Sequence, residues 1–380
     1  MLKRFLIILL FALTGLAASG QQPNRADDKI RSETISPGIE LISIDRGNFA
    51  ENATGDRWMI KALIADSKLA RLRLGQAMDE IAGAETTSSI AARHVALAAV
   101  NGGYFRTTGI VRGEPVGVLT MRGKMLSEPV SNRAALAVVD DGRQIRLAIT
   151  HMTVKSELLL DGKAVRAVSG FNRPREKDEL IIFTPEFHRT TLTDADGVEL
   201  TVTTNRIASI NDLRGSQPIP HSGFVISAHG ASRDWALSNL RRGARIEIKT
   251  ALSTVPPVAF KPDFILGGGP QLVSRGKKVF AAETSRYSES LYRQRHPRTA
   301  VGWLADGKLI LLTVDGRQKQ SVGMTIDELA NLMLEFDCVE AMNLDGGGST
   351  TMVVKGKVVN HPSDATGERA VSDALLVFPR

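Results

Sequence analysis

The chain has 380 residues, of which 43% are hydrophobic and 23% are charged. That balance is typical of a globular protein with a substantial core, arranged in one large domain or two. The formal net charge is +7 at pH 7, but no dense basic run or aromatic-basic motif accompanies it, so the sequence predicts no nucleic-acid partner. Cys338 is the only cysteine, which excludes an intrachain disulfide.

The N-terminus has the pattern of a secretory signal peptide over residues 1–20. Lys3 and Arg4 form its charged region, an apolar run follows over residues 5–16, and small residues at 17–20 form a cleavage region. The apolar run is too short for a comfortable membrane span, so we expect cleavage and no stable span afterwards. An uncleaved N-terminal anchor is the alternative. Cleavage leaves a net charge of +5, which suits an exported protein that meets anionic polymers, and the sequence predicts a periplasmic or secreted location.

The residues that follow divide into a leader, an N-terminal group of strands and one main unit. Residues 21–37 are polar and of mixed charge, which predicts a flexible leader. Short apolar runs over residues 38–94 predict strands that join the core. We expect the main unit to run over residues 95–380 as a single large domain. A more polar stretch at about 173–217 is interpreted as an inserted lobe within it.

A glycine-containing turn between two apolar runs recurs along the main unit. Such turns predict β-hairpins, although the residues between them do not match at a fixed period and form no sequence repeat. The sequence therefore predicts an α+β fold, in which hairpin-rich mixed β-sheets are covered by a few helices. The turns are centred on Gly123, Gly142, Gly162, Gly307 and Gly356.

The clearest helix is predicted over residues 325–337. Thr325 and Glu328 have the spacing of a capping box at its start. Shorter helices are predicted over residues 88–93 and 233–242. Apolar residues at helical spacing give the long helix one face that can pack on a sheet, and they are Ile326, Leu329, Leu332, Met333 and Phe336.

The stretch Ala341–Val359 carries three consecutive glycines between two apolar runs. Glycines permit backbone conformations closed to other residues and leave no side chain between main-chain amides and a ligand. Asp345 and Ser349 stand on either side of Gly346–Gly348, so the turn could present N–H groups, a carboxylate and a hydroxyl to an anion. The residues after the turn favour a strand over a helix, which argues against a P-loop. The alternative is a tight hairpin in which the glycines only make the turn.

Two shorter stretches place a polar side chain beside glycine at a strand end. Asn101 ends an apolar strand and is followed by Gly102 and Gly103, which would let a backbone or ligand approach. Glu114 lies between glycine and proline just before another strand. Asn-Gly is also a common turn signal, and Glu114 could equally be a solvated loop carboxylate.

A second triple-glycine turn, Gly267–Gly269, also follows an apolar strand, and we interpret the two turns as facing each other across a cleft. Arg298 precedes an apolar strand, where a guanidinium could grip a phosphate or carboxylate with two parallel hydrogen bonds. A surface ion pair is the alternative role for Arg298. His296 is interpreted as a loop residue before proline.

The sequence contains no ligand spacing typical of zinc sites and no Gly-x-Ser-x-Gly nucleophile motif. No cofactor is therefore certain. A divalent metal remains an open alternative, because Asp345, Asp315 and Glu114 could meet in space.

Seven motifs together resemble the phosphodiester glycosidase family, which is typified by N-acetylglucosamine-1-phosphodiester α-N-acetylglucosaminidase. NLDGGGSTTM is the most specific of them, whereas the segment before Val95 and the stretch at 173–217 carry none. The resemblance implies that residues 95–380 hydrolyse the bond between the anomeric carbon of a sugar and a phosphodiester. In the family's order, the motifs are NGGYF, GEPVG, LGGGPQL, HPRTAVG, TVDGR, NLDGGGSTTMVV and GERAVSDALLVF.

The implied reaction needs a carboxylate that activates water or attacks the anomeric carbon. Asp345 is the first candidate for this role, Glu114 is the second, and Glu368 in the closing motif is the third. A cation and main-chain amides would hold the phosphate and stabilise the charge on the leaving oxygen. The expected substrate-binding residues are Asn101, Gly102, Gly268, Gly269, Arg298, Thr299, Gly346, Gly347 and Ser349.

The single cysteine and the style of the signal peptide look bacterial, unlike the cysteine-rich modules of the animal members. We therefore expect an envelope or extracellular sugar-phosphate polymer or glycan as the partner. Two alternatives stay open: a non-catalytic envelope protein that binds anionic glycans, and a glycosidase that acts on phosphate-free glycans.

Overall fold

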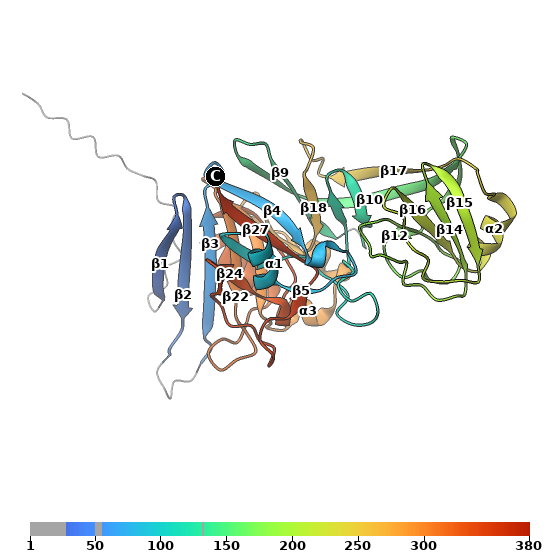
Figure 1. Cartoon of the computed structure of the whole chain (residues 1–380). Helices are drawn as coiled ribbons and strands as arrows, with labels where there is room; N and C mark the ends of the chain where they lie inside the picture. The colour runs from blue at the N-terminus through green and yellow to red at the C-terminus, as the bar shows by residue number, and fades with distance from the viewer. Residues whose placement is uncertain (1–27, 50–54, 131–132) are drawn as a thin grey trace, which may run out of the picture.

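The computed structural model describes residues 28–49, 55–130 and 133–380, and it consists mostly of β-strands (Figure 1). The predicted signal peptide lies outside these residues. Named strands pair antiparallel throughout, except that β12 and β13 are parallel. The prediction of several sheets with few helices is confirmed, but the α+β class is corrected to a nearly all-β fold, because the helices are short. No helix within the described ranges is long and apolar enough to cross a membrane.

The largest sheet has eight strands, and both of its faces are buried at its centre. On its central strand β22, Leu309 and Leu311 join one hydrophobic cluster, while Ile310 and Leu312 join another on the opposite face. This follows from the alternation of side chains along a strand. In spatial order the strands are β1 (Lys29–Ser36), β2 (Ile39–Arg46), β3 (Trp58–Ala65), β22 (Leu309–Val314), β21 (Arg298–Leu304), β23 (Cys338–Asn343), β19 (Gln271–Ser274) and β20 (Lys277–Lys278).

A five-stranded sheet lies beside the large sheet and shares its central cluster through residues such as Val100 and Leu375. A two-stranded sheet of β5 (Glu85–Thr86) and β26 (Ala370–Val371) borders it. In spatial order the five strands are β25 (Lys357–Val358), β24 (Met352–Val354), β6 (Ala98–Asn101), β27 (Asp373–Pro379) and β4 (Ala70–Gln76).

The third sheet has seven strands and extends into a lobe at one end of the molecule (Figure 1). Its two longest strands pair from His151 opposite Val255 to Leu160 opposite Ile246. In spatial order its strands are β11 (Lys163–Ala167), β10 (Ile145–Leu160), β9 (Ala134–Asp140), β18 (Phe264–Gly267), β7 (Leu119–Met121) and β8 (Lys124–Ser127), with β17 (Ile246–Val255) also on β10.

The lobe has its own five-stranded sheet and its own hydrophobic cluster, which includes Leu158, Leu200 and Ile226. The sequence prediction placed an inserted lobe at about 173–217, and the domain boundaries stay a prediction. The strands of the lobe sheet, in spatial order, are β12 (Gly170–Phe171), β13 (Leu180–Phe183), β16 (Gly223–Ala228), β14 (Val198–Thr203) and β15 (Arg206–Asp212).

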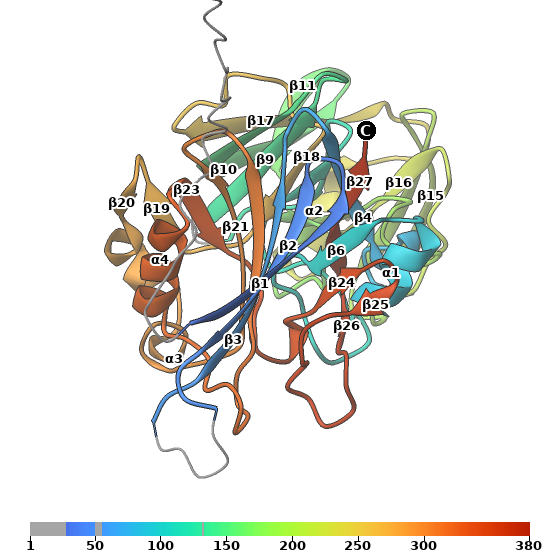
Figure 2. The same ribbon diagram turned by 90° about the vertical axis from the view of Figure 1, so that its left-hand side faces the viewer.

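Helix α4 (Ile326–Glu335) confirms the longest predicted helix and covers one face of the large sheet near β19 and β23 (Figure 2). Thr325 and Glu328 form the capping box: Glu328 N donates to Thr325 Oγ1 at 3.2 Å and Thr325 N donates to Glu328 Oε2 at 2.9 Å. The remaining helical segments are α1 (Thr87–Arg93), α2 (Ala231–Asn239) and α3 (Glu289–Arg293), with 3₁₀ turns at Ala77–Asp79, Phe280–Arg286 and Gly347–Ser349.

The hairpin predictions are confirmed, because each predicted turn joins two strands that pair antiparallel: β7 with β8, β9 with β10, β10 with β11, β21 with β22, and β24 with β25. The leader prediction over residues 21–37 is wrong in its second half. There, Lys29–Ser36 form β1, which pairs with β2 along the edge of the large sheet.

Candidate functional site

The loop that carries Asp345 passes from one sheet to another. Strand β23 ends at Asn343 in the eight-stranded sheet, and β24 begins at Met352 in the five-stranded sheet. These two strands are not partners, so the hairpin alternative is wrong. Gly347 has a φ of +61°, and a Cβ on Gly346 would lie 2.6 Å from the Pro297 carbonyl oxygen. The path between the sheets therefore needs glycine at both positions.

Two of the glycine amides are engaged within the protein. Gly346 N donates to Asp345 Oδ1 at 2.9 Å, and Gly347 N donates to the Pro297 carbonyl at 2.9 Å. The first bond orients the Asp345 carboxylate, and the second ties the loop to the start of β21. These amides therefore shape the loop, instead of forming the anion cradle that the sequence suggested.

Asn101, at the end of β6, is fully buried and connects three segments. Its Nδ2 donates to the Asp345 carbonyl at 2.8 Å, and its Oδ1 accepts from Thr299 Oγ1 at 2.7 Å and from Thr351 N at 3.1 Å. Its side-chain hydrogen bonds thus all go to protein groups. Asn101 and Thr299 hold the Asp345 loop against β6 and β21, which is a positioning arrangement.

Gly102 brings a second carboxylate close to the loop. Asp345 N donates to the Gly102 carbonyl at 3.0 Å, and Gly103 N donates to Asp373 Oδ1 at 2.8 Å. A side chain on Gly102 would collide with that carboxylate oxygen, so glycine is required for Asp373 to reach Gly103. Asp373 is buried, and burial raises its pKa.

Asp345 is a partly buried carboxylate whose pKa is raised to about 6. Burial is the main cause, and the negative charge of Asp373 adds to it. The Gly346 N–H and the positive charge of Arg369 partly offset the shift, and so does the Ser349 hydroxyl. A carboxyl group with a pKa in this range can take up and release a proton near neutral pH.

The second glycine turn lies directly against the end of β23. Gly269 N donates to the Asn343 carbonyl at 2.7 Å, while Asn343 Nδ2 donates to the Gly269 carbonyl at 3.1 Å and to Tyr104 Oη at 2.8 Å. Gly268 N is bonded to the Ala134 carbonyl at 3.0 Å. The two triple-glycine turns are therefore neighbours that share Asn343.

An aromatic wall stands on this side of the site. Tyr104 Oη donates to the Gly269 carbonyl at 2.7 Å, and Tyr287 Oη donates to the Gly268 carbonyl at 2.9 Å. The two ring centroids are 6.4 Å apart, and the Arg133 guanidinium lies 5.9 Å from the Tyr104 centroid and 4.7 Å from the Tyr287 centroid. Burial and the charge of Asp345 raise the pKa of Tyr104, so its hydroxyl stays protonated.

Arg298 is only 2% exposed and is held by main-chain carbonyls. Its Nε donates to Met324 at 2.7 Å, and its Nη2 donates to Leu291 at 2.7 Å and Gln294 at 3.1 Å. Burial lowers its pKa to about 10. These two nitrogens already donate to main-chain carbonyls, so they cannot form the predicted pair of parallel hydrogen bonds to a phosphate or carboxylate.

Two other arginines flank the Asp345 loop. A Cβ on Gly347 would lie 3.2 Å from Arg317 Nη2, and a side chain on Gly348 would collide with the guanidinium of Arg369. Arg369 is paired with Asp364 through two hydrogen bonds, of 2.8 and 3.0 Å. Both cations thus lie against the glycines that follow Asp345.

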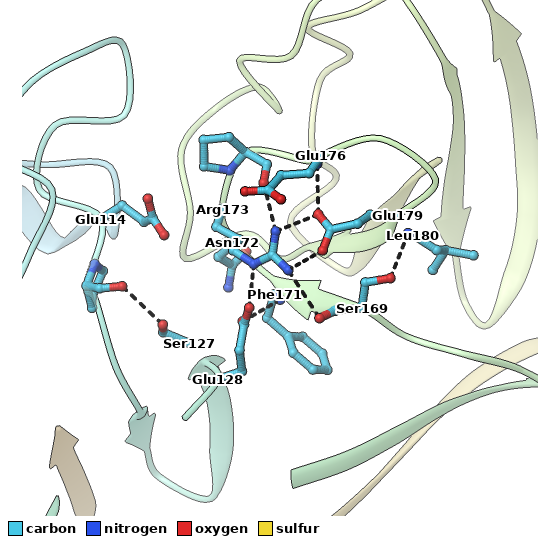
Figure 3. A network of polar contacts seen from close by, with 12 residues as sticks. Glu114, Ser127, Glu128, Ser169, Phe171, Asn172, Arg173, Glu176, Glu179 and Leu180 are labelled. Atoms are coloured by element: carbon cyan, nitrogen blue, oxygen red, sulfur yellow. Dashed lines mark hydrogen bonds and ion pairs between the residues drawn. The ribbon is translucent and has the colours of Figure 1, made fainter. Parts of the chain in front are cut away.

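Glu114 belongs to a different environment. It is 4% exposed and accepts a hydrogen bond from Arg106 Nε at 2.8 Å. Burial raises its pKa, and the charges that act on it are those of Arg106, Glu128 and Arg173. Figure 3 shows it beside the polar network around Arg173. Among the described residues, no hydrogen bond or ion pair joins Glu114 to Asp345, so the structure does not bring these two candidate carboxylates together.

Glu368, the third candidate, caps a helix. Its Oε2 accepts from the backbone N–H of Ser88 at 3.0 Å, in the first turn of α1. A carboxylate at that position satisfies a free N–H group and complements the helix dipole. This gives Glu368 a structural contact at the start of α1.

The three carboxylates proposed for a metal do not meet. Asp315 is buried and holds the loop after β25, because its oxygens accept from Asn360 Nδ2 at 2.9 Å and from His361 N at 3.0 Å. Across residues 28–49, 55–130 and 133–380, no group of three His, Cys, Asp or Glu side chains is arranged to hold a metal ion. The shared metal site suggested by the sequence is therefore wrong for Asp345, Asp315 and Glu114.

A groove of about 560 Å³ lies elsewhere, between the β7–β8 hairpin and the lobe. Its lining includes Lys124, Phe171 and Phe224, and none of the predicted site residues. We locate the candidate site at Asp345 because the perturbed carboxylate, the cations and the glycine turns converge there, whereas the groove has no such group of reactive side chains.

Sequence reasoning missed five residues that surround Asp345. Four lie inside the motifs already noted, so their neighbourhood in sequence was the available signal: Tyr104, Arg317, Arg369 and Asp373. Tyr287 lies outside every motif and reaches the site only through the tertiary fold.

Comparison with known proteins supports the motif-based resemblance. Residues 196–378 match the family model described as phosphodiester glycosidase. The N-acetylglucosamine-1-phosphodiester α-N-acetylglucosaminidase of Bos taurus is 49% identical over 67 residues, which are 18% of this chain and 12% of that protein. An uncharacterised prophage-derived protein of Bacillus subtilis is 46% identical over 83 residues, 22% of this chain and 13% of that protein. This chain therefore aligns with only a small part of either relative.

Solved structures resemble nearly the whole chain. A Burkholderia pseudomallei protein described as exported has a TM-score of 0.81 at 23% identity, covering 96% of this chain and 99% of that one. A hypothetical protein from Synechocystis has a TM-score of 0.78 at 22% identity, covering 93% and 64%. At such identities the likeness concerns the fold. The family match confirms the resemblance that the motifs indicate: residues 196–378 of this chain match the phosphodiester glycosidase family model.

Proposed function

We propose that this chain hydrolyses sugar-1-phosphodiesters between the anomeric carbon and the oxygen that links it to phosphate. Water supplies the new hydroxyl on the sugar, and the phosphate monoester leaves with the linking oxygen. The observation that supports this most is Asp345, a partly buried carboxylate with a pKa near 6, beside two arginines in the most specific motif of the family.

Asp345 is the proposed reactive carboxylate. Its ionised form can remove a proton from water or attack the anomeric carbon directly, and both roles belong to known routes of glycoside hydrolysis. The Gly346 N–H at 2.9 Å and the bonds from Asn101 to the loop hold the carboxylate in place. The leaving phosphate monoester is a stable anion, so the reaction depends less on a proton donor than ordinary glycoside hydrolysis does.

Substrate-binding roles are proposed for the groups around Asp345. Arg317 and Arg369 place positive charge beside the loop, which favours a substrate with a phosphate. The aromatic wall of Tyr104 and Tyr287 offers ring surface against which the apolar face of a sugar can pack.

We further propose that the chain works in the periplasm or outside the cell, on a sugar-phosphate polymer or glycan. The signal-peptide pattern of residues 1–20 and the net positive charge support this location. The fold is also shared with a protein described as exported.

Purified protein should release free sugar from an α-linked sugar-1-phosphodiester panel that includes a UDP-linked sugar. Asp345→Asn should lower kcat by at least about 10³-fold, because loss of a nucleophile or base removes the reacting group. Asp196→Asn is the matched control: it makes the same change in charge, at an exposed position in the lobe. Chromatography of the released sugar and phosphate monoester provides the measurement.

The outcomes separate the alternatives. Release of sugar from p-nitrophenyl glycosides but from no phosphodiester would identify a glycosidase for phosphate-free glycans. Binding of the phosphodiesters without turnover by folded wild-type protein would identify a glycan-binding protein. Either result overturns the proposal.

A further inference from the structure

Among the described residues, the arginine that lies against Gly347 has no ion-pair partner. Arg317 is exposed, and neither Arg317 nor Arg298 has an ion-pair partner among the residues that the structure describes. Their charges act on each other: the pKa of Arg298 is lowered first by burial, and the charge of Arg317 lowers it further. The charge of Glu328 acts on Arg298 in the opposite direction, but no carboxylate of the described residues is paired with either guanidinium. Two neighbouring cations that lack an ion-pair partner favour the binding of an anion between or beside them.

The Arg317 side chain reaches the Asp345 loop from an unusual backbone conformation. Arg317 has a backbone φ of +61°, a conformation that residues other than glycine adopt rarely. The preceding carboxylate of Asp315 is fixed by Asn360 and His361, and Gln318 Nε2 donates to the His361 carbonyl at 2.8 Å. Firm bonds on both sides thus maintain an unusual backbone conformation, as is common at functional sites.

His296 holds the guanidinium in place. Its Nδ1 lies 3.1 Å from Arg317 Nη2, and its Nε2 lies 3.2 Å from the Ser290 carbonyl. This geometry requires the tautomer with its proton on Nε2, because Nδ1 must accept from the guanidinium. Burial, together with the charges of Arg298 and Arg317, lowers the pKa of His296 and favours this neutral form.

Arg369, the other arginine at the Asp345 loop, already forms an ion pair. Arg369 uses Nε and Nη2 for Asp364, so a carboxylate compensates its charge. Within the described residues, the Arg317 guanidinium makes a single hydrogen bond, to a neutral imidazole, and four of its five N–H groups remain for a ligand.

We propose that Arg317 recognises the phosphate of the substrate, with His296 as its positioning residue, so that Arg317 sets the preference for sugar phosphodiesters over neutral glycosides. This inference rests on the proposed function for its substrate. Phosphate oxygens match the planar guanidinium with two parallel hydrogen bonds, and the position against Gly347 places the phosphate beside the Asp345 loop.

Binding and turnover test this assignment separately. Isothermal titration calorimetry on the Asp345→Asn protein would use N-acetylglucosamine 1-phosphate as the probe and N-acetylglucosamine as the neutral comparison. Adding Arg317→Gln should weaken binding of the phosphate ester about 30- to 100-fold, the loss expected for a charge-assisted pair of hydrogen bonds. Binding of the neutral sugar should change by less than about twofold. Arg214→Gln is the matched control, because Arg214 is exposed in the lobe.

Turnover should follow the same pattern in the protein with Asp345 intact. Arg317→Gln should lower kcat/KM for the phosphodiester about 100-fold, and this loss should greatly exceed any loss for a p-nitrophenyl glycoside of the same sugar. His296→Ala should raise KM for the phosphodiester, and His296→Asn, which keeps an acceptor, should restore part of the loss.

The failures are distinguishable. If wild type hydrolyses no phosphodiester, the proposed function fails, while the calorimetric comparison still tests Arg317. Unchanged binding of the phosphate ester in Arg317→Gln overturns the assignment of Arg317. So does an equal loss for the phosphate ester and the neutral sugar, since that would indicate a structural effect.

Discussion

At the scale of single residues, the ionisation of Asp345 depends on its neighbour Asp373. Both carboxyl groups are raised in pKa by burial, and Asp345 reaches about 6 with the charge of Asp373 as a further cause. If Asp345 must be ionised to react, kcat/KM should rise with pH through about 6 and level off above it. The apparent pKa of this acidic limb of the pH profile describes the pair of carboxyl groups and not Asp345 alone, because interacting groups titrate together.

Asp373→Asn should move this limb to lower pH by roughly half a unit to one unit, because removing a nearby negative charge favours ionisation of Asp345. Asn can still accept the hydrogen bond from Gly103 N, so the loop geometry should persist. The measurement is the pH dependence of kcat/KM in both proteins, with Asp196→Asn as control. A limb that stays in place or moves to higher pH contradicts the coupling.

What sequence could reveal at this scale was residue type and motif, not contact. Asp345 was recognisable from its motif, and the structure gives it a perturbed pKa. Arg298 looked equally suitable as a phosphate ligand, but its donors turn inward to carbonyls that lie on α3, just after it and on the turn before α4. The direction of a side chain depends on packing between segments distant in sequence, which no local pattern encodes.

At the scale of elements, α4 supports the sheet from which the Asp345 loop emerges. Its capping box satisfies N–H groups at the helix start, and Glu328 also pairs with Arg295 at 2.6 Å. Thr325→Ala should lower the free energy of unfolding by about 1 kcal/mol, the usual cost of losing an N-cap side chain. Urea denaturation would measure it, with Thr108→Ala at an exposed loop position as control.

The same change should leave binding of a sugar 1-phosphate unaffected, since no hydrogen bond of the described residues joins Thr325 to the loop glycines. A loss of stability no larger than that of Thr108→Ala would show that the cap contributes little. A loss of binding would mean that α4 couples to the site more tightly than its contacts suggest.

Local elements were predictable because their signals are local. Glycine turns between apolar runs identified five hairpins, and capping residues with 3.6-residue periodicity identified α4. The polar stretch Lys29–Ser36 was expected to be flexible, yet it forms an edge strand, because main-chain pairing with β2 does not require apolar side chains. The crossing of the Asp345 loop between two sheets is a matter of topology, and the flanking strands alone resembled a hairpin.

At the scale of the whole molecule, a polar network fastens the lobe to the body. Figure 3 shows Arg173 between Glu128, just after β8 of the body, and Glu179, just before β13 of the lobe. Arg173 donates from Nε to Glu128 and from Nη1 and Nη2 to the two oxygens of Glu179, both at 2.7 Å. Glu128 also accepts from Phe171 N at 2.9 Å. Sequence could mark this region as polar, but it could not show which carboxylates one arginine would join.

Arg173→Met should lower the free energy of unfolding by about 2–3 kcal/mol, because it leaves two partly buried carboxylates without their shared cation. The matched variant is Arg233→Met, which breaks an exposed pair with Asp212 inside the lobe and should cost less than about 1 kcal/mol. Urea denaturation gives the two values, and limited proteolysis reports whether the lobe strands become accessible before the body unfolds.

Because Asp345 lies outside this network, sugar-phosphate binding should survive in both variants under conditions where they stay folded. Equal losses of stability would show that the network around Arg173 does not hold the lobe more firmly than an ordinary surface ion pair.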